Sequence, residues 1–327
     1  MKNNQIGIVG VGYWGTNILN VLHKIGIKNI YCHDNNIKNL NELKKKFPKI
    51  KIVKNFKEFL NLDFLGVIIA VDTKLHFQIA KKCLNKGLNI FVEKPVTNSS
   101  KKLKVLSKIA KSKNLLIMSG YIYFYNDYIK YIKKILKRNH LGNIYYVSCE
   151  RFNLGPVRND VSAAWDLSSH DIAICSYLFD KNLSITNVHG YDFLKKNIND
   201  ISTISAKINN IRLDIKSSWL NPEKIRKIVI VGKKRMLLFD ELDFQNPIKI
   251  YNKYATYPKT YNFKKNFFTQ KANIYFGSTL TPKIKSKSPL ENEMREFLKC
   301  LNFKKKPSTS IKVSINILKT LEKLNRI

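Results

Sequence analysis

The sequence has few cysteines and no long apolar run, and each of these scarcities excludes a class of protein. Its five cysteines are odd in number, lie far apart and form no Cys-x-x-Cys pair, so neither a disulfide framework nor a metal site is expected. No stretch approaches the roughly 18 apolar residues of a membrane span. The first predicted strand begins within a few residues of Met1, which leaves no room for a signal peptide. We therefore expect a protein of the reducing cytoplasm.

Acidic residues are also scarce, and this scarcity makes the chain strongly basic. The sequence holds 23 acidic and 59 basic residues, which gives a formal net charge of +36. Only 8 of the 59 basic residues are arginine, and the lysines are spread through every segment, with short clusters such as 44–46 and 304–306. This dispersal is typical of a compositional bias on solvated helix faces, so it argues against nucleic-acid binding as the main function. A basic surface can still gather anionic substrates by electrostatic steering.

Three closely spaced glycines near the N-terminus are the most informative feature of the chain. They stand between an apolar run, predicted as a buried strand over 5–9, and a helical pattern. This spacing is typical of a loop whose backbone amides approach a pyrophosphate at a helix N-terminus. The first glycine permits a tight turn, the second lets a phosphate come close, and the third lets the helix pack on the strand. The predicted cofactor contacts in this loop are Gly10, Gly12, Tyr13, Trp14 and Gly15.

An acidic residue follows the second predicted strand. The strand covers 28–33 and is followed directly by Asp34, nineteen residues after Gly15. An acid in this place accepts hydrogen bonds from the adenosine ribose of a dinucleotide. Asn35 and Asn36 follow it, and no arginine stands nearby to receive a 2′-phosphate. The pattern therefore favours NAD over NADP as cofactor.

The order of predicted elements divides the chain into two domains. Apolar strands alternate with amphipathic helical patterns over 1–120, which predicts an α/β Rossmann domain with a doubly wound parallel sheet. Short strands follow one another over much of 121–327, which predicts an α+β domain with a mostly antiparallel open sheet, for substrate binding and oligomerisation. The helical patterns within 290–327 are expected to pack back near the first domain. The segment 244–289 gives mixed signals, and we expect it to wrap the surface.

Two further segments end at the edge of the predicted parallel sheet where open α/β sheets bind ligands. They add the predicted cofactor contacts Ala70, Asp72, His76, Glu93 and Lys94. Lys94 follows the fifth strand and is expected near the reactive face of a nicotinamide. A solvated lysine is the plainer interpretation in a chain so rich in lysine. Pro95 favours the functional interpretation, because it fixes the backbone at the end of the strand.

A second group of titratable residues opens a predicted helix over 166–179. Asp166 and His170 are four residues apart, so they share one helix face. An imidazole suits the removal of a proton from a carbinol, a carboxylate can orient it, and a lysine ammonium can polarise the same oxygen. The structural alternative gives neither residue a catalytic role. The acid would then stabilise the N-terminus of the helix, and the histidine would form its hydrogen bonds within the fold.

Together these motifs resemble the Gfo/Idh/MocA family, named after glucose-fructose oxidoreductase, inositol dehydrogenase and rhizopine catabolism. The motifs that carry the resemblance are Gly10-Val11-Gly12-Tyr13-Trp14-Gly15, Leu75-His76, Glu93-Lys94-Pro95 and Asp166-Leu167-Ser168-Ser169-His170. The resemblance implies that Lys94 and His170 are a catalytic pair, with Asp166 beside them. It also implies that the segment around Lys94 lines the nicotinamide ribose, often with a cis-proline. An open sheet that forms an oligomer contact is a further implication, so a homodimer or homotetramer is expected.

The segment 150–160 leads into the helix of His170 and is similar to a branch of the family that acts in sugar modification and surface-polysaccharide pathways. Arg158 is suited to a phosphate or carboxylate of the substrate, because its guanidinium is planar and bidentate. The alternative is a surface pair with Asp160. Trp165 either walls the substrate pocket or belongs to the core. The candidate substrate contacts are Asn153, Arg158, Trp165 and Asp171.

The sequence therefore favours an NAD-dependent oxidoreductase that oxidises a ring hydroxyl of a sugar or nucleotide sugar to a ketone. In this interpretation His170 accepts the proton, Lys94 polarises the oxygen and NAD accepts the hydride. Two alternatives keep the fold: an oxidoreductase whose tightly bound NAD is recycled within one catalytic cycle, and a non-catalytic dinucleotide-dependent binding protein. The expected partner is a small-molecule substrate, with no nucleic acid or membrane.

Overall fold

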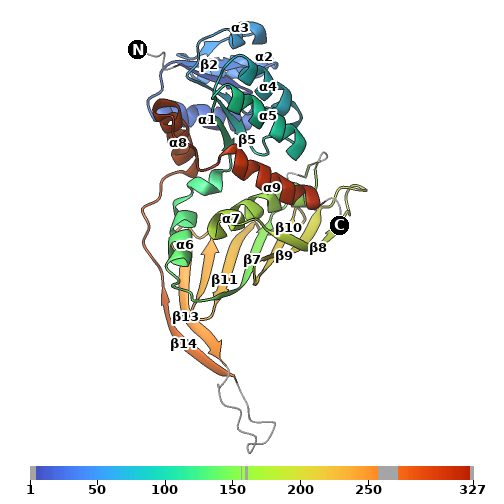
Figure 1. Cartoon of the computed structure of the whole chain (residues 1–327), viewed down its shortest axis with the longest axis vertical. Coiled ribbons are helices and arrows are strands. Elements are labelled where there is room, and N and C mark those ends of the chain that lie inside the picture. The colour runs from blue at the N-terminus through green and yellow to red at the C-terminus, as the bar shows by residue number, and fades with distance from the viewer. Residues whose placement is uncertain (1–4, 156, 159–160, 257–271, 325–327) are drawn as a thin grey trace, which may run out of the picture. The chain divides into compact units, whose positions relative to one another are not determined.

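The computed structural model describes residues 5–155, 157–158, 161–256 and 272–324. The chain divides into two compact units, drawn in Figure 1. The first consists of Met1–Asn126 and Lys287–Glu322, and the second consists of Asp127–Ser286 and Lys323–Ile327. Among the described residues, no helix has the length and apolar character needed to cross a membrane.

The first unit is built on a six-stranded sheet in which all neighbouring strands are parallel. Its order is β3-β2-β1-β4-β5-β6, and this arrangement confirms the predicted Rossmann fold. The strands are β1 (Ile6–Val9), β2 (Ile30–His33), β3 (Lys51–Ile52), β4 (Gly66–Ile69), β5 (Ile90–Glu93) and β6 (Ile117–Gly120). Four of them, β1, β4, β5 and β6, are buried at every residue. Parallel strands covered on both faces need such continuous apolar runs. The order reverses between β1 and β4, where open α/β sheets place their ligands.

Helices with one apolar stripe cover this sheet. Those that follow the strands are α1 (Tyr13–Lys24), α2 (Ile37–Lys46), α3 (Phe56–Leu60), α4 (Thr73–Asn85) and α5 (Ser100–Ser112). In α1 the buried stripe includes Ile18, Leu19 and Leu22, which follow the helical repeat. Two later helices, α8 (Pro289–Phe303) and α9 (Ile311–Lys323), also belong to this unit through Glu322.

Helix α9 is tied to the start of α5 by a carboxylate from the far end of the chain. The backbone nitrogen and the Oγ of Ser100 each donate to Glu322, at 2.6 Å. This contact supplies an anion at the N-terminus of α5, where the helix dipole and the unpaired amides favour negative charge. A second link joins Ser119 of β6 to Ser314 of α9, with 2.5 Å between their hydroxyl oxygens.

The second unit contains an eight-stranded sheet of order β14-β13-β12-β11-β7-β10-β9-β8. Only the pair β7 and β10 is parallel within the described sheet, so the prediction of a mostly antiparallel sheet is confirmed. Two helices, α6 (Asp127–Lys137) and α7 (Ser169–Phe179), lie along one face of it (Figure 1). The strands are β7 (Ile144–Phe152), β8 (Ser184–Tyr191), β9 (Ile201–Ile208), β10 (Ile211–Ser218), β11 (Ile225–Gly232), β12 (Met236–Asp240), β13 (Ile248–Thr256) and β14 (Asn273–Leu280).

The prediction that 244–289 wraps the surface is wrong for residues 248–256 and 273–280. Strands β13 and β14 instead pair with each other and extend the sheet beyond β12. Every residue of β14 is exposed except one that is half-buried. The strand therefore lacks the apolar alternation that would have identified it. Residues 257–271 of this segment lie outside the described residues.

Candidate functional site

Two glycines of the N-terminal loop are required by the protein's own packing. Gly10 has a φ of +89°, and a Cβ built there would lie 2.7 Å from the carbonyl oxygen of Ala70. A Cβ on Gly15 would lie only 2.0 Å from the carbonyl oxygen of Gly10. The backbone oxygens in these contacts cannot move aside as the end of a flexible side chain could. Gly10 thus permits the tight turn and Gly15 permits helix α1 to close on it.

Gly12 is different, because nothing in the protein demands a glycine there. Its φ is −66°, which any residue adopts, and a Cβ would meet no atom within 4 Å. Gly12 is the N-cap of α1, where serine or asparagine would serve at least as well. The space that a side chain would fill belongs to a cavity. A ligand that closely approaches the backbone at the N-terminus of α1 accounts for the glycine.

Asp34 closes the other side of this loop. Its carboxylate accepts hydrogen bonds from the backbone nitrogens of Val11 and Asn36, both at 2.8 Å. The side-chain amide of Asn39 donates to the same carboxylate at 3.4 Å. These bonds fix the carboxylate against the glycine loop and at the carboxyl end of β2. A carboxylate can accept further hydrogen bonds, so Asp34 remains suited to ribose hydroxyls.

A cavity of about 760 Å³ lies over the glycine loop and the carboxyl ends of the strands. Seven of the predicted cofactor contacts line it: Gly10, Gly12, Tyr13, Trp14, Asp34, Ala70 and Asp72. Its volume and its place at the switch point of the sheet fit a dinucleotide. The predicted contacts Gly15, His76, Glu93 and Lys94 are outside this lining.

One wall of the cavity was not predicted from the sequence. Helix α4 contributes Leu75, Gln78, Ile79 and Lys82 to the lining. Their spacing follows one helix face, and that periodicity was the available signal. Lys82 also lies over the ring of Phe56, with its Nζ 5.7 Å from the ring centroid.

His76 lies beneath the loops and braces them. It is 1% exposed, and its ring nitrogens lie 2.9 Å from the carbonyl oxygens of Val71 and Pro95. Burial lowers the pKa of this imidazole, which favours the neutral form. His76 therefore lies between the loop after β4 and the loop after β5, and as a neutral ring it donates to one of the two carbonyls. The loop after β5 contains the cis Lys94–Pro95 peptide bond that the resemblance implies.

Glu93 connects the lysine segment to the glycine loop. Its carboxylate accepts a hydrogen bond from the indole nitrogen of Trp14 and another, at 3.2 Å, from the backbone nitrogen of Lys94. The carboxylate also lies directly over Gly120, where a Cβ would be 2.8 Å from Oε2. Burial raises the pKa of Glu93 to about 7, against the opposing effect of these hydrogen bonds.

A second buried carboxyl group belongs to the same unit. Glu293 of α8 is 0% exposed, and neither of its carboxylate oxygens has a hydrogen-bond partner among the described residues. Burial, followed by the charge of Glu93, raises the pKa of Glu293 well above its usual range. The two carboxyl groups thus disfavour each other's ionisation.

The raised pKa of Glu93 predicts a stability that falls as pH rises. Its unfolded reference pKa is 4.5 and its folded pKa is about 7, so the folded state holds the extra proton between these values. We expect the unfolding free energy of the wild-type protein to fall by roughly 2 to 3 kcal/mol between pH 5 and pH 8 because of Glu93. In Glu93→Gln this decrease should be absent. Urea denaturation at each pH measures it. The exposed Glu42→Gln should keep the wild-type slope, and an unchanged slope in Glu93→Gln would contradict the assignment.

In the second unit, Asp166 lies just before helix α7, and His170 is the second residue of that helix. Residues Ala164–Ser168 form one π-helical turn that leads directly into α7. π-Helical turns are rare and occur often at functional sites. Arg158 lies beside this turn, with its Nη1 3.6 Å from Oδ1 of Asp166. The alternative pairing of Arg158 with Asp160 concerns a residue outside the described part of the chain.

The other candidate substrate contacts occupy different environments. Asp171 is 1% exposed and forms a bidentate pair with Arg151, with both N–O distances at 2.8 Å. This pair fastens the start of α7 to the end of β7, so the structure places Asp171 in the core rather than at a substrate surface. Asn153 donates to the carbonyl oxygen of Gly155 through its side chain. Trp165 is half-buried.

Comparison with known proteins finds a family model that matches part of the first unit. Residues 4–121 match the family model described as an oxidoreductase family with an NAD-binding Rossmann fold. This model is the one named Gfo/Idh/MocA. The match contains the glycine loop, Asp34 and Lys94, so the resemblance drawn from the motifs is confirmed there.

Similar proteins extend the comparison beyond the Rossmann unit. The chain is 26% identical over 201 residues to scyllo-inositol 2-dehydrogenase (NADP(+)) IolW of Bacillus subtilis (strain 168), covering 56% of this chain and 53% of the relative. The chain thus spans about half the length of the curated relatives it matches. The UDP-N-acetylglucosamine 3-dehydrogenase GnnA of Acidithiobacillus ferrooxidans has the same fold, with a TM-score of 0.79 at 19% identity over 98% of this chain and 96% of that one. GenD2 from gentamicin A biosynthesis, in complex with NAD, has a TM-score of 0.79 at 16% identity over 100% and 94%.

Proposed function

We propose that this protein is an NAD-dependent dehydrogenase that oxidises a ring hydroxyl of a sugar or nucleotide sugar to a ketone. The observation that carries the proposal is the cavity over Gly12, a glycine that neither the backbone nor the packing requires. The family of residues 4–121 supports a dinucleotide as the ligand. The substrate class is supported by relatives named as dehydrogenases of scyllo-inositol and of UDP-N-acetylglucosamine, which both carry ring hydroxyls.

The chain would hold the dinucleotide through groups that already surround the cavity. The backbone amides at the start of α1 would face the pyrophosphate, and Asp34 would accept hydrogen bonds from the adenosine ribose. Glu93 would keep Trp14 and the backbone of Lys94 in place beside the cofactor. When bound, NAD supplies the acceptor for a hydride.

The remaining chemistry is assigned to side chains of this chain. We assign proton acceptance from the substrate hydroxyl to the imidazole of His170, with Asp166 as the carboxylate that orients it. We assign to Lys94 the stabilisation of the negative charge that develops on the same oxygen. Arg158, which is ion-paired with Asp166, is proposed to contact an anionic group of the substrate. Oligomerisation through the open sheet is also part of the proposal.

The cofactor preference gives a direct test of Asp34. A carboxylate beside the adenosine ribose repels a 2′-phosphate, so we expect the wild-type protein to bind NAD more tightly than NADP. Asp34→Asn keeps a hydrogen-bond acceptor but removes the charge, and it should lower the NAD-to-NADP affinity ratio by about tenfold. Fluorescence titration with both cofactors measures the ratio. Asp63→Asn, an exposed control, should leave it unchanged. A ratio that stays constant in Asp34→Asn would show that another residue discriminates between NAD and NADP; Lys82, a lysine of the cavity lining, would be tested next.

The activity itself is tested by a screen of inositols, aldoses and nucleotide sugars with NAD and NADP. Reduction of the nicotinamide is followed as absorbance at 340 nm, and thermal shifts identify ligands that bind without turnover. Net reduction with a ring-hydroxyl substrate is the expected result. Cofactor that co-purifies and resists dialysis, with no net nicotinamide change, would instead indicate internal recycling. Binding of dinucleotide without turnover of any substrate would favour a sensor.

A further inference from the structure

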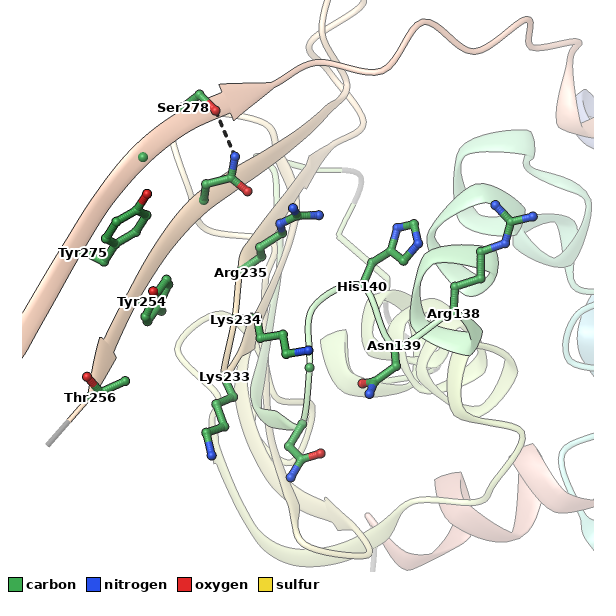
Figure 2. Close-up of a pocket in the computed structure, with 14 residues that line it drawn as sticks. Arg138, Asn139, His140, Lys233, Lys234, Arg235, Tyr254, Thr256, Tyr275 and Ser278 are labelled. Carbon is green, nitrogen blue, oxygen red and sulfur yellow. Dashed lines mark hydrogen bonds between the residues drawn. The ribbon is translucent and has the colours of Figure 1, made fainter. Parts of the chain in front are cut away.

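A second cavity lies wholly within the second unit, at one end of its sheet. Its volume is about 1060 Å³, and its lining comes from three segments. Figure 2 shows them: the turn after α6 with Arg138, Asn139 and His140; the turn between β11 and β12; and the outer strands β13 and β14. The turn is pinned to the loop after α6 by two backbone hydrogen bonds, from Lys233 to Asn143 at 2.8 Å and from Lys234 to Leu141 at 2.9 Å. The cavity walls are therefore joined before any ligand arrives.

The cavity is distinct from the residues assigned to catalysis. Asn143 lies just before the first residue of β7, whereas Arg151 lies near its last residue and pairs with Asp171, the neighbour of His170. Strand β7 is nine residues long, which separates its ends by roughly 26 Å. A molecule bound in this cavity would not touch His170.

The charge of the lining selects an anion. Arg138, Lys233, Lys234 and Arg235 line the cavity, and none of the fourteen lining residues is acidic. None of these four cations forms an ion pair with a carboxylate that the structure describes. Lysines occur everywhere in this chain, but arginines do not, and two of its eight arginines meet here. The C-terminal end of α6 contributes only about half a negative charge, which the four cations outweigh.

The opposite wall offers a flat apolar surface beside the charges. Tyr254 of β13 and Tyr275 of β14 stack, with ring centroids 4.9 Å apart and an interplanar angle of 27°. Figure 2 shows the two rings side by side on neighbouring strands. Tyr275 is 52% exposed, so its ring is accessible to a ligand. Hydroxyl and amide groups complete the lining, among them those of Asn139, Thr256 and Ser278.

We propose that this cavity binds a phosphate-bearing small molecule, with the phosphate at Arg235 and Lys234 and a ring on the tyrosine platform. Arginine and lysine bind phosphate through charge-assisted hydrogen bonds, and ring faces stack on tyrosine. The volume fits a small molecule. Nucleotides and sugar phosphates share the required chemistry.

Calorimetric titration of the full chain tests this site. The probes are inorganic pyrophosphate, uridine diphosphate and glucose 6-phosphate, at 150 mM salt and with saturating NAD so that the dinucleotide cavity is filled. We expect Arg235→Ala to weaken pyrophosphate binding about tenfold. Arg212→Ala removes the same charge from an exposed position on β10, a strand of the same sheet outside the lining, and should change affinity less than twofold. Tyr275→Ala should weaken a ring-bearing probe several-fold and leave pyrophosphate unchanged.

The pattern across variants decides the outcome. A larger Tyr275→Ala effect on uridine diphosphate than on glucose 6-phosphate would identify a nucleotide ligand, and the reverse would identify a sugar phosphate. Equal losses in Arg212→Ala and Arg235→Ala would attribute binding to overall charge and overturn the proposal. Absence of wild-type binding to all three probes at millimolar concentration would also overturn it. A single-stranded DNA that binds more tightly than every probe and depends on Arg235 would replace the small molecule with a polymer.

Discussion

Replacement of Lys94 by methionine is expected to lower turnover a hundred- to a thousandfold while NAD binding survives. Methionine keeps most of the length and apolar stem of lysine but cannot stabilise charge on the substrate oxygen, and loss of one such donor has about this effect. The backbone nitrogen of Lys94, which donates to Glu93, is retained in the variant. Steady-state rates on the substrate found in the screen and a parallel NAD titration measure the two properties.

Two companion variants make this result specific. Lys101→Met removes an exposed lysine from the first turn of α5 and should retain wild-type rates. His170→Asn should lose turnover as Lys94→Met does, since the proton acceptor is gone. Most of the activity remaining in Lys94→Met or His170→Asn would remove the proposed mechanism, whereas a loss of NAD binding would show that the residue holds the cofactor instead.

Alanine at Gly12 and alanine at Gly15 are expected to fail in opposite ways. The Cβ of Gly12→Ala would enter the cavity without meeting a protein atom, so we expect NAD affinity to fall about tenfold or more while unfolding free energy changes by less than about 1 kcal/mol. The Cβ of Gly15→Ala would meet the backbone oxygen of Gly10 at 2.0 Å, which forces the helix away from the loop. We expect it to lower unfolding free energy by about 1 to 3 kcal/mol.

The comparison is informative because both changes add one methyl group to the same loop. Urea denaturation and NAD titration of the two proteins, side by side, measure stability and affinity separately. Wild-type affinity in Gly12→Ala would mean that no ligand approaches this backbone, and the assignment of the cavity would fall. Wild-type stability in Gly15→Ala would mean that the loop and the helix can separate at little cost.

Strong sequence patterns predicted most of the fold, and weak ones did not. Strands such as β1 and β5 are buried on both faces, so they appear in the sequence as unbroken apolar runs. Strand β14 is almost wholly exposed, and its pairing with β13 depends on backbone hydrogen bonds that leave no mark on residue type. Helix α9 was predicted from its repeat, but its attachment to Ser100 depends on a single carboxylate 222 residues away.

The candidate site divides in the same way. The glycine spacing and the acid after β2 predicted residues on one side of the cavity over the glycine loop. They could do so because each of these residue types meets a steric or hydrogen-bonding requirement. The α4 wall was missed, since residues such as Gln78 and Ile79 carry no distinctive chemistry. Glu293 was also missed: its importance arises from burial near Glu93, and burial is a property of the folded chain.

The hydrogen bonds between Ser100 and Glu322 have a consequence for the synthesis of the protein. The first unit takes helices α8 and α9 from the end of the polypeptide, although its sheet is complete by Gly120. A ribosome that adds about 5 to 20 residues per second therefore exposes this sheet while the intervening sheet is synthesised. During this time Phe91 of β5 lacks its ring contact with Phe297 of α8. Premature termination before α8 would release a nascent chain that cannot complete its first unit.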